Sequence, residues 1–364
     1  MSELIYDGRH WRKGGIGEVI CVHLDAIASA SNLAHVMILV LPDDCARARE
    51  RWPALQIIAA PSLFSVGEQL FFGWYASLGY RFISPYLTFP LMAPERTILW
   101  VHDFIWVKYP RYASSKMAWL YFSIMQLLAH LFVDRKVYIS RFTKMVAKQL
   151  FGTSTGNVLH NPVRIVAGKL RSGCTPDPGP AKVLYMGTWK KWKRVPLLLG
   201  AHNLLTRAYP KPVILTLIGG AKTNNDDNIK SLAAEAIKAG LIRELGYVDA
   251  ASWRDELAAC DVVVVPSAME GFGLPLIEAL GAGKRAVAAA GTVAEELVGP
   301  LATYFSEPTP TALAAAIEHA LQLGPLTKEE LGQAAICCQY YSVQAHQERF
   351  LRILNEAQVE SLVI

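Results

Sequence analysis

The chain has 364 residues, more than one hydrophobic core usually supports, so its length predicts two domains of about 150 to 200 residues each. Hydrophobic residues make up 52% and charged residues 18%. This balance excludes intrinsic disorder, because burial of apolar surface can offset the entropy of ordering the chain. Six cysteines without a CxxC pair exclude a disulfide scaffold and indicate reduced thiols.

The formal net charge of +5 is concentrated in the first half of the chain. Residues 1–165 carry 17 Lys or Arg and 11 Asp or Glu, whereas the remainder carries 19 and 20. This asymmetry predicts that the first half faces something anionic. A lipid headgroup surface, a phosphate-bearing substrate and nucleic acid all fit at this stage, and so does an ordinary solvated surface.

Short apolar runs alternate with longer segments of helical period along the whole chain. Buried strands are predicted at residues 36–41, 97–101, 136–140, 182–187, 213–218, 261–265 and 285–289. This alternation predicts parallel sheets covered on both faces and joined by right-handed crossovers. The predicted fold class is therefore α/β, with doubly wound sheets.

The regular pattern lapses between residues 162 and 181, where proline and glycine collect. We therefore predict an N-terminal domain over residues 1–165 and a C-terminal domain over residues 166–345. A C-terminal helix over residues 346–364 is expected to cross back to the N-terminal domain. Two Rossmann-like domains facing across a cleft would bind a ligand beyond the carboxyl ends of their strands.

No membrane span is predicted. The N-terminus, MSELIYDGRHWRKGG, lacks the apolar core of a cleavable signal, which predicts a cytoplasmic location. Residues 117–133 are apolar over a length at the short limit for spanning, and we expect a buried helix there because a charged residue and a strand follow at once. Glycine and proline interrupt the aromatic-rich residues 63–92, so these are not one membrane helix, although such loops could lie at a bilayer interface.

The most specific local pattern is PSAMEGFGLPLIEA, residues 266–279, which directly follows a predicted strand. Gly271 and Gly273 leave room for a ligand to approach the backbone, and the proline that follows suits the first turn of a helix. The amides of Phe272, Gly273 and Leu274 would point at the occupant of this loop. Because a helix N-terminus favours an anion, phosphate is the expected occupant.

Two carboxylates flank this loop, Glu270 before the helix and Glu278 a turn into it. They could accept hydrogen bonds from hydroxyls at the two ends of a sugar-containing ligand. With these residues the sequence resembles glycosyltransferase family 4, the retaining GT-B enzymes, whose E-x7-E signature fits EGFGLPLIE without gaps. The resemblance implies that Glu270 contacts the donor sugar near the reacting centre and that Glu278 holds the nucleotide ribose.

A second loop, YMGTWKKWKR at residues 185–194, places cations after a strand-end glycine. Such cations neutralise the charge that grows on a leaving diphosphate. The resemblance aligns Lys193 with the phosphate-binding lysine of the family, but Trp192 stands where the family has an arginine. Lys190, Lys191 and Arg194 are the candidates to replace that arginine. For Lys190 and Lys191 a solvated charge run is the alternative.

Further site residues are implied by the resemblance. His102, after the strand at residues 97–101, aligns with a family histidine near the donor sugar, although a histidine there is often only a satisfied core residue. Asp103 and Trp106 are expected on the acceptor side, whereas Ser140 is expected to cap a helix. The other donor-binding positions lie in two glycine loops and beside the base: Gly15, Gly17, Gly219, Gly220 and Tyr247.

Taken as a family 4 member, the chain is expected to be a hexosyltransferase that moves a hexosyl group, with mannosyl from GDP-mannose favoured over UDP and dTDP sugars. The acceptor would be a glycan or a polyprenyl-diphosphate-linked glycan, and attack would be front-face without a metal or another cofactor. An anionic membrane surface on the inner face of the cytoplasmic membrane is an expected partner, and nucleic acid is not. The rival interpretations are a sugar-nucleotide epimerase and a non-catalytic scaffold.

Overall fold

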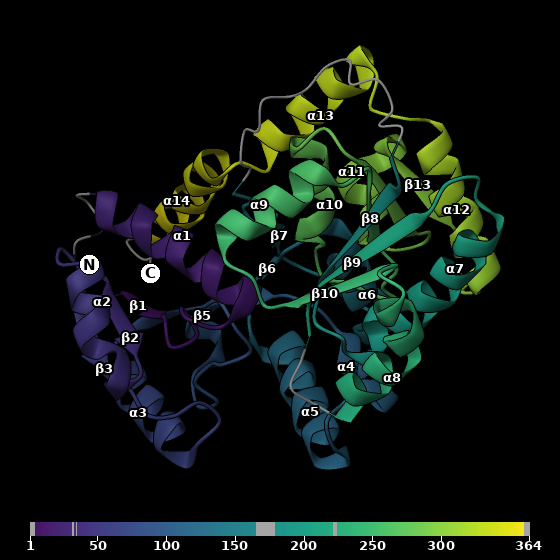
Figure 1. The fold of residues 1–364 in the computed structure, drawn as a ribbon. Coiled ribbons are helices and arrows are strands. Elements are labelled where there is room, and N and C mark those ends of the chain that lie inside the picture. Colours follow the sequence, from purple (N-terminus) through teal and green to yellow (C-terminus); the bar gives the residue numbers. More distant parts are fainter. Residues whose placement is uncertain (1–3, 31–32, 34, 165–178, 221–223, 360–364) are drawn as a thin grey trace. The chain divides into compact units, whose positions relative to one another are not determined.

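The computed structural model describes residues 4–30, 33, 35–164, 179–220 and 224–359. The chain forms two compact units, one of Met1–Pro162 with Val343–Ile364 and one of Val163–Ser342. Each unit has its own parallel β-sheet with helices packed against it (Figure 1). The predicted fold class, α/β with two parallel sheets, is therefore confirmed. Most of the predicted junction, residues 165–178, lies outside the described residues.

The first unit contains a seven-stranded sheet of order β3-β2-β1-β4-β5-β6-β7 in which all neighbours are parallel. Its strands are β1 (Leu4–Asp7), β2 (Met37–Val40), β3 (Gln56–Ala59), β4 (Arg81–Ser84), β5 (Thr97–Val101), β6 (Arg135–Tyr138) and β7 (Asn157–Val158). Its helices are α1 (Gly14–Ser29), α2 (Cys45–Arg51), α3 (Val66–Ser77), α4 (Ile105–Lys108), α5 (Lys116–Phe132), α6 (Arg141–Phe151) and α14 (Val343–Val359). The strand order reverses between β1 and β4, which makes that point the topological switch of the sheet.

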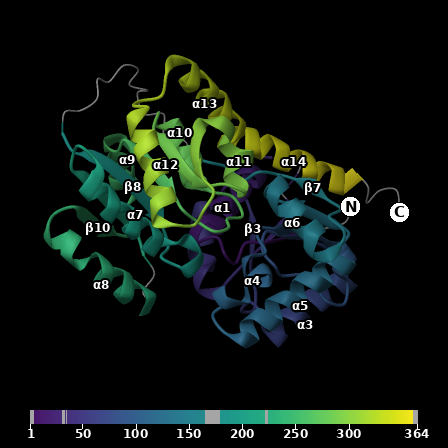
Figure 2. The same ribbon diagram turned by 90° about the vertical axis from the view of Figure 1, so that its right-hand side faces the viewer.

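The second unit contains a six-stranded parallel sheet of order β10-β9-β8-β11-β12-β13 (Figure 2). Its strands are β8 (Ala181–Gly187), β9 (Val213–Gly219), β10 (Ile242–Gly246), β11 (Val262–Val265), β12 (Arg285–Ala289) and β13 (Ala302–Phe305). Its helices are α7 (Val195–Ala208), α8 (Asn224–Lys238), α9 (Ala250–Ala259), α10 (Leu274–Gly281), α11 (Val293–Val298), α12 (Pro310–Gln322) and α13 (Lys328–Tyr340). Here the switch point lies between β8 and β11.

The predicted strands correspond to β2, β5, β6, β8, β9, β11 and β12, with ends within two residues of the predicted ones. These are runs of buried apolar side chains, for which burial on both faces of the sheet is the physical reason. The prediction that Ser140 caps a helix is also confirmed, because its Oγ accepts a hydrogen bond from the Thr143 amide at 3.0 Å at the start of α6.

The prediction of a buried helix over residues 117–133 is only half right. α5 does form there, and Gln126 and His130 on its inner face are buried. However, its outer face is exposed over its whole length, with Met117 74% and Leu131 62% accessible. The sheet covers only one side of the helix, and no other element of the described chain covers the opposite side. None of the helices in the described chain is both long and apolar enough to span a bilayer.

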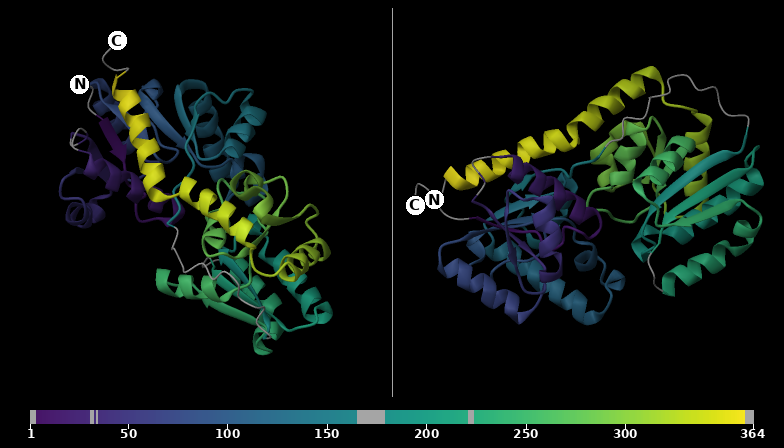
Figure 3. Two further views of the ribbon diagram at one scale, coloured as in Figure 1. Left: turned by 90° about the horizontal axis from the view of Figure 1, so that it is seen from above. Right: turned by 60° about the vertical axis from the view of Figure 1, so that its left-hand side comes forward.

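A buried chain of histidines holds α14 on the first unit, where it lies along α1 (Figure 3). His346 of α14 donates from Nδ1 to the His160 carbonyl at 2.7 Å, which leaves its Nε2 as an acceptor. His23 of α1 therefore donates from Nε2 to His346 at 2.8 Å and accepts from the Tyr6 hydroxyl at 2.8 Å. The network thus needs both imidazoles to be neutral.

We expect acid to loosen α14 from the first unit. Burial lowers the pKa of His346 to about 4 and also lowers the pKa of His23. Their stabilising contribution is therefore complete above the ordinary histidine pKa of about 6.5 and is lost as the pH falls from there towards 4. For His346 the loss at pH 5 is about 2 kcal/mol.

The measurement is the free energy of opening of the α14 amides by hydrogen exchange between pH 7.5 and pH 5. Acidification from pH 7.5 to pH 5 should lower this free energy less in the His346→Gln variant than in the wild type. The two decreases should differ by about 2 kcal/mol. An equal fall in both proteins would contradict the assignment.

Candidate functional site

The loops at the switch point of the second sheet carry the two motifs that the sequence singled out. Residues 188–194 follow β8 and residues 266–273 follow β11, and these strands are neighbours in the sheet. A hydrogen bond from the Ala268 amide to the Trp192 carbonyl, 2.8 Å long, ties the two loops together. Ligands of open α/β sheets bind at this edge, so the geometry agrees with a site built from both loops.

Lys193 and Glu270 form an ion pair in these loops, through Nζ and Oε1. The Ser267 hydroxyl donates to the same Oε1 at 2.6 Å. The Lys193 side chain is 20% and the Glu270 side chain 16% exposed, so both charges are mostly shielded but reach the solvent. Burial and the charge of Glu270 also raise the pKa of Tyr185, the tyrosine of β8. The structure therefore brings together a fixed carboxylate and an ammonium group, which were predicted separately.

Helix α10 begins at this edge. Its N-cap residue is Gly273, which has φ of +120° and no side chain that could accept from the first amides. Pro275 occupies the first turn, as expected. Phe272 is 4% exposed and packs on the ring of Tyr341, with centroids 5.7 Å apart, so its side chain belongs to the core. Gly271 is buried too, and Leu274 is partly exposed.

Glu278, one turn into α10, is partly exposed as a residue, but its carboxyl oxygen Oε2 is buried. Its Oε2 has no hydrogen-bond partner among the described residues. Burial raises the pKa of Glu278 to about 7, so near neutral pH the protonated and ionised forms coexist. A buried carboxyl oxygen without a partner costs free energy unless another group hydrogen-bonds to it, which suits a side chain that awaits a ligand hydroxyl.

The cations beside Lys193 have local roles of different kinds. Lys190 is exposed, and its Nζ lies 5.0 Å from the ring centroid of Trp192, a cation–π distance. Arg194 is the N-cap residue of α7 with φ of +53°, a left-handed conformation that turns the chain sharply into the helix. Trp192 thus carries Lys190 over its ring, and its backbone carbonyl accepts from the Ala268 amide.

The second glycine loop serves the sheet itself. Gly219 has φ of +103°, and a Cβ on it would lie 2.2 Å from the Gly187 carbonyl oxygen. The Gly220 amide donates to the same oxygen at 3.3 Å, so these glycines let β8 and β9 end close together. Tyr247 follows β10 and is 72% exposed, and its hydroxyl donates to the Gly220 carbonyl. Because β10 ends at Gly246, Tyr247 lies just beyond the strand.

Gly15 and Gly17 were predicted to lie in a loop. The structure places both in the first turn of α1 instead. Gly15 is exposed and Gly17 is buried. A Cβ on Gly17 would lie 2.8 Å from the Trp11 carbonyl oxygen. The glycine therefore allows the loop before α1 to pack closely against the helix. The helix begins at Gly14, and in its first turn the Gly17 amide donates to the Lys13 carbonyl at 3.0 Å.

His102, Asp103 and Trp106 lie in the first unit, after β5. His102 donates from Nε2 to the Pro85 carbonyl at 2.6 Å, and burial lowers its pKa to about 4, so the ring is neutral with Nδ1 as its acceptor nitrogen. Asp103 accepts from the Ile105 amide at 2.9 Å and thereby caps the start of α4. Trp106 packs edge-on against the ring of Phe122, with centroids 4.8 Å apart.

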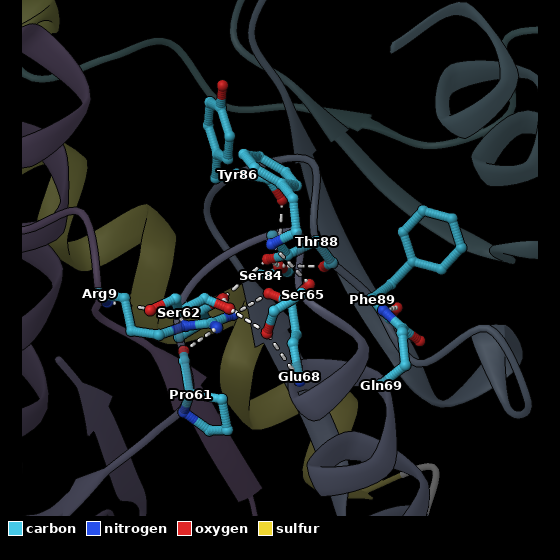
Figure 4. A network of polar contacts seen from close by, with 12 residues as sticks. Arg9, Pro61, Ser62, Ser65, Glu68, Gln69, Ser84, Tyr86, Thr88 and Phe89 are labelled. Carbon is cyan, nitrogen blue, oxygen red and sulfur yellow. Dashed lines mark hydrogen bonds and ion pairs between the residues drawn. The ribbon is translucent and has the colours of Figure 1, made fainter. Parts of the chain in front are cut away.

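Sequence reasoning missed a buried ionic network at the switch point of the first sheet (Figure 4). Arg9 forms ion pairs with Asp7 at 2.6 Å and with Glu68 at 2.7 Å, and donates to the Pro61 carbonyl at 2.9 Å. Thr88 donates to Asp7 at 2.7 Å. The signal that could have found it is an Asp-Gly-Arg sequence that begins at the last residue of β1, at the carboxyl end of a central strand.

Comparison with known proteins finds similarity to glycosyltransferases in the second unit. Residues 169–336 match the family model "Glycosyl transferases group 1". Over 143 residues, 38% of this chain and 36% of the relative, the chain is 34% identical to an O-antigen chain mannosyltransferase B of Escherichia coli. It is also 34% identical to a D-inositol 3-phosphate glycosyltransferase of Pseudarthrobacter chlorophenolicus, over 31% of this chain and 27% of that protein. The matched segments thus span about a third of these curated relatives.

Among solved structures, HepE of Anabaena in complex with UDP has a TM-score of 0.72 and 19% identity, with 98% of this chain and 100% of that chain covered. At such low identity, the structural similarity establishes the fold alone, and this fold is GT-B. The family match and the names of the curated relatives support an enzyme of the hexosyltransferase class.

Proposed function

Because its second unit carries a glycosyltransferase group 1 domain on a GT-B fold, we propose that this chain is a retaining glycosyltransferase that uses a nucleotide-diphosphate sugar. The observation that supports it best is the Lys193–Glu270 pair at the switch point of the second sheet, directly before the start of α10. A donor of this kind needs an acceptor for sugar hydroxyls and a cation for its diphosphate, and this pair supplies both.

In this proposal Glu270 accepts hydrogen bonds from the sugar, and the carboxyl group of Glu278 bonds the ribose through its unpartnered Oε2. The ammonium of Lys193 and the first amides of α10 hold the diphosphate, with Lys190, Arg194 and the loop glycines in support. His102 would accept from a sugar hydroxyl through Nδ1, since its Nε2 hydrogen is committed to Pro85.

The leaving diphosphate gains charge as the glycosidic bond breaks. We propose that Lys193 and the amides of α10 stabilise this charge, that the diphosphate takes the acceptor's proton, and that attack occurs on the front face with retention. This mechanism needs no second carboxylate as a nucleophile, unlike the double displacement of retaining hydrolases. It also assigns no step to a metal ion.

For the donor we favour GDP-mannose, which fits the name of the Escherichia coli relative. UDP-glucose is the alternative, because HepE of Anabaena has been solved with it. The proposed acceptor is a glycan or a polyprenyl-diphosphate-linked glycan, with the enzyme at the inner face of the cytoplasmic membrane.

The test is incubation of the full chain with labelled GDP-mannose, UDP-glucose and dTDP-glucose, without acceptor, to detect slow hydrolysis. We expect one donor to be hydrolysed well above the others and at an unchanged rate in excess EDTA. Proton NMR of the released sugar, recorded before it equilibrates, should show the anomeric configuration of the donor. Loss of all turnover in EDTA, with recovery on addition of a divalent metal, would refute the metal-free mechanism.

A further inference from the structure

The outer faces of α3 and α5 expose large apolar side chains at helical spacing. On α3 and the residue after it they recur at every fourth position, and on α5 at every third or fourth. We call these nine side chains the α3/α5 apolar surface; all are at least 45% exposed, and they are Val66, Leu70, Trp74, Leu78, Met117, Leu120, Ile124, Leu127 and Leu131.

The register of the sheet shows that α3 and α5 cover the same face of it. Phe82 of β4 packs on Phe72 of α3, with ring centroids 5.2 Å apart, and pairs in register with Thr97 of β5. Leu99, two residues further along β5, points to that same face. It pairs with Lys136 of β6, whose ammonium donates to backbone carbonyls at the end of α5. The outer faces of the two helices therefore point in the same direction.

The two helices are also neighbours where they begin. The ring of Phe64, just before α3, lies 5.5 Å from the rings of both Tyr121 and Phe122 of α5. Figures 1 and 2 show both helices along one side of the first unit. The α3/α5 apolar surface thus extends over two helices that adjoin each other through these three aromatic rings.

The exposed charges on α5 and on the loop that leads into it have one sign. Residues 105–132, which include all of α5, contain no Asp or Glu, and the single acid of α3, Glu68, is buried in the ion pair with Arg9. Three exposed cations stand on or just before α5: Lys108, Arg111 and Lys116. The guanidinium of Arg111 also lies over tyrosine rings.

The second unit shows that this exposure is not a property of the whole chain. Only two of its exposed large apolar residues, Ile336 and Tyr340, share a helix, and the others lie on separate elements: Leu204, Leu232, Tyr247 and Leu323. Single exposed apolar residues are normal on a protein surface, but a continuous apolar face is not.

We propose that the α3/α5 apolar surface enters the boundary between headgroups and acyl chains of an anionic lipid bilayer, with Lys108, Arg111 and Lys116 on the lipid phosphates. Aromatic and aliphatic side chains flanked by cations are what such an interface takes up. α5 lies on the bilayer and does not span it, since its inner face is packed on the sheet. A second copy of the chain fits this surface less well, because its residues 105–132 add three more cations and no carboxylate. The inference rests on the proposed function in one respect, namely that the proposed acceptor is bound to a membrane.

The test is cosedimentation of the full chain with vesicles of phosphatidylcholine alone or mixed with phosphatidylglycerol. We expect tight binding to the mixed vesicles and weaker binding to the neutral ones. Leu70→Glu with Leu127→Glu should weaken binding about 100-fold, because each leucine contributes roughly a factor of ten. Lys108→Gln, Arg111→Gln and Lys116→Gln should each weaken binding to the anionic vesicles about fivefold.

The matched control is Leu232→Glu with Ile336→Glu, which adds the same charges at exposed positions of the second unit and should bind as the wild type does. Unchanged binding by the Leu70/Leu127 variant, or no binding of the wild type to either vesicle, would overturn the inference. So would self-association of the wild type that the Leu70/Leu127 variant abolishes, because the surface would then be a protein interface. Slow hydrolysis of the nucleotide sugar should be equal in all variants, so that failure of the membrane inference is separate from failure of sugar transfer.

Discussion

Glu270→Gln lowers the turnover of sugar transfer by about 10²-fold or more and leaves the binding of the nucleoside diphosphate product unchanged or tighter. The amide keeps the shape of the side chain but loses the charge that accepts hydrogen bonds from sugar hydroxyls. At the same time it releases Lys193 from its ion pair, so the ammonium becomes available to phosphate oxygens. Turnover should therefore fall while product affinity does not. The hydrolysis or transfer rate measures turnover, and calorimetry with GDP and UDP measures affinity.

Lys193→Gln should give a different pattern from Glu270→Gln. It removes the cation from the diphosphate, so both turnover and product affinity fall, the affinity by about tenfold. A purely structural ion pair would give the same result for both variants, because both break the same contact. Equal effects of Glu270→Gln and Lys193→Gln on product affinity would thus remove the assigned roles.

The matched control for both variants is Glu256→Gln in the same unit. Glu256 accepts two hydrogen bonds from Arg243 at 2.7 and 2.9 Å, a pair of similar geometry that lies between β10 and α9. Because the Arg243 side chain is 48% exposed, this pair contributes little to stability after solvent screening. Its loss should leave turnover within twofold of the wild type.

The sequence could predict the loops of the second unit because the information there is local. The strand β11, the two glycines, the proline and Glu270 follow one another within fifteen residues, and backbone stereochemistry constrains each of them. That Lys193 meets Glu270 is not local, since the residues are 77 positions apart. It follows only once β8 and β11 are known to be neighbours, which the strand order of a doubly wound sheet supplies.

The first unit was harder to predict for a different physical reason. Its β1, β3 and β4 each contain polar residues, and β3 is partly exposed, so no continuous apolar run marks them. An apolar helix such as α5 looks buried in a sequence, because hydrophobicity shows what prefers to leave water and not what covers it. The histidine pair of α1 and α14 is separated by 323 positions, and no spacing rule reaches that far.

Arg9→Met should destabilise the first unit by about 3–5 kcal/mol. The methionine preserves most of the volume but leaves two carboxylates, Asp7 and Glu68, buried without a cation. Their side chains are 6% and 2% exposed, so water cannot replace the lost hydrogen bonds. Urea unfolding of the first unit measures the effect. Arg12→Met is the control, because Arg12 pairs with Asp44 at 2.7 Å in the same loop but is 48% exposed, and it should cost less than about 1 kcal/mol.

The two carboxylates should also differ from each other. Burial would raise the pKa of Asp7, but Arg9 and Thr88 lower it overall, whereas for Glu68 burial outweighs Arg9 and its pKa is raised. Arg9 therefore favours the ionised form of Asp7 more strongly than that of Glu68. Asp7→Asn should accordingly destabilise the unit more than Glu68→Gln. If the two substitutions cost the same, the positive charge of Arg9 is shared evenly between the two carboxylates.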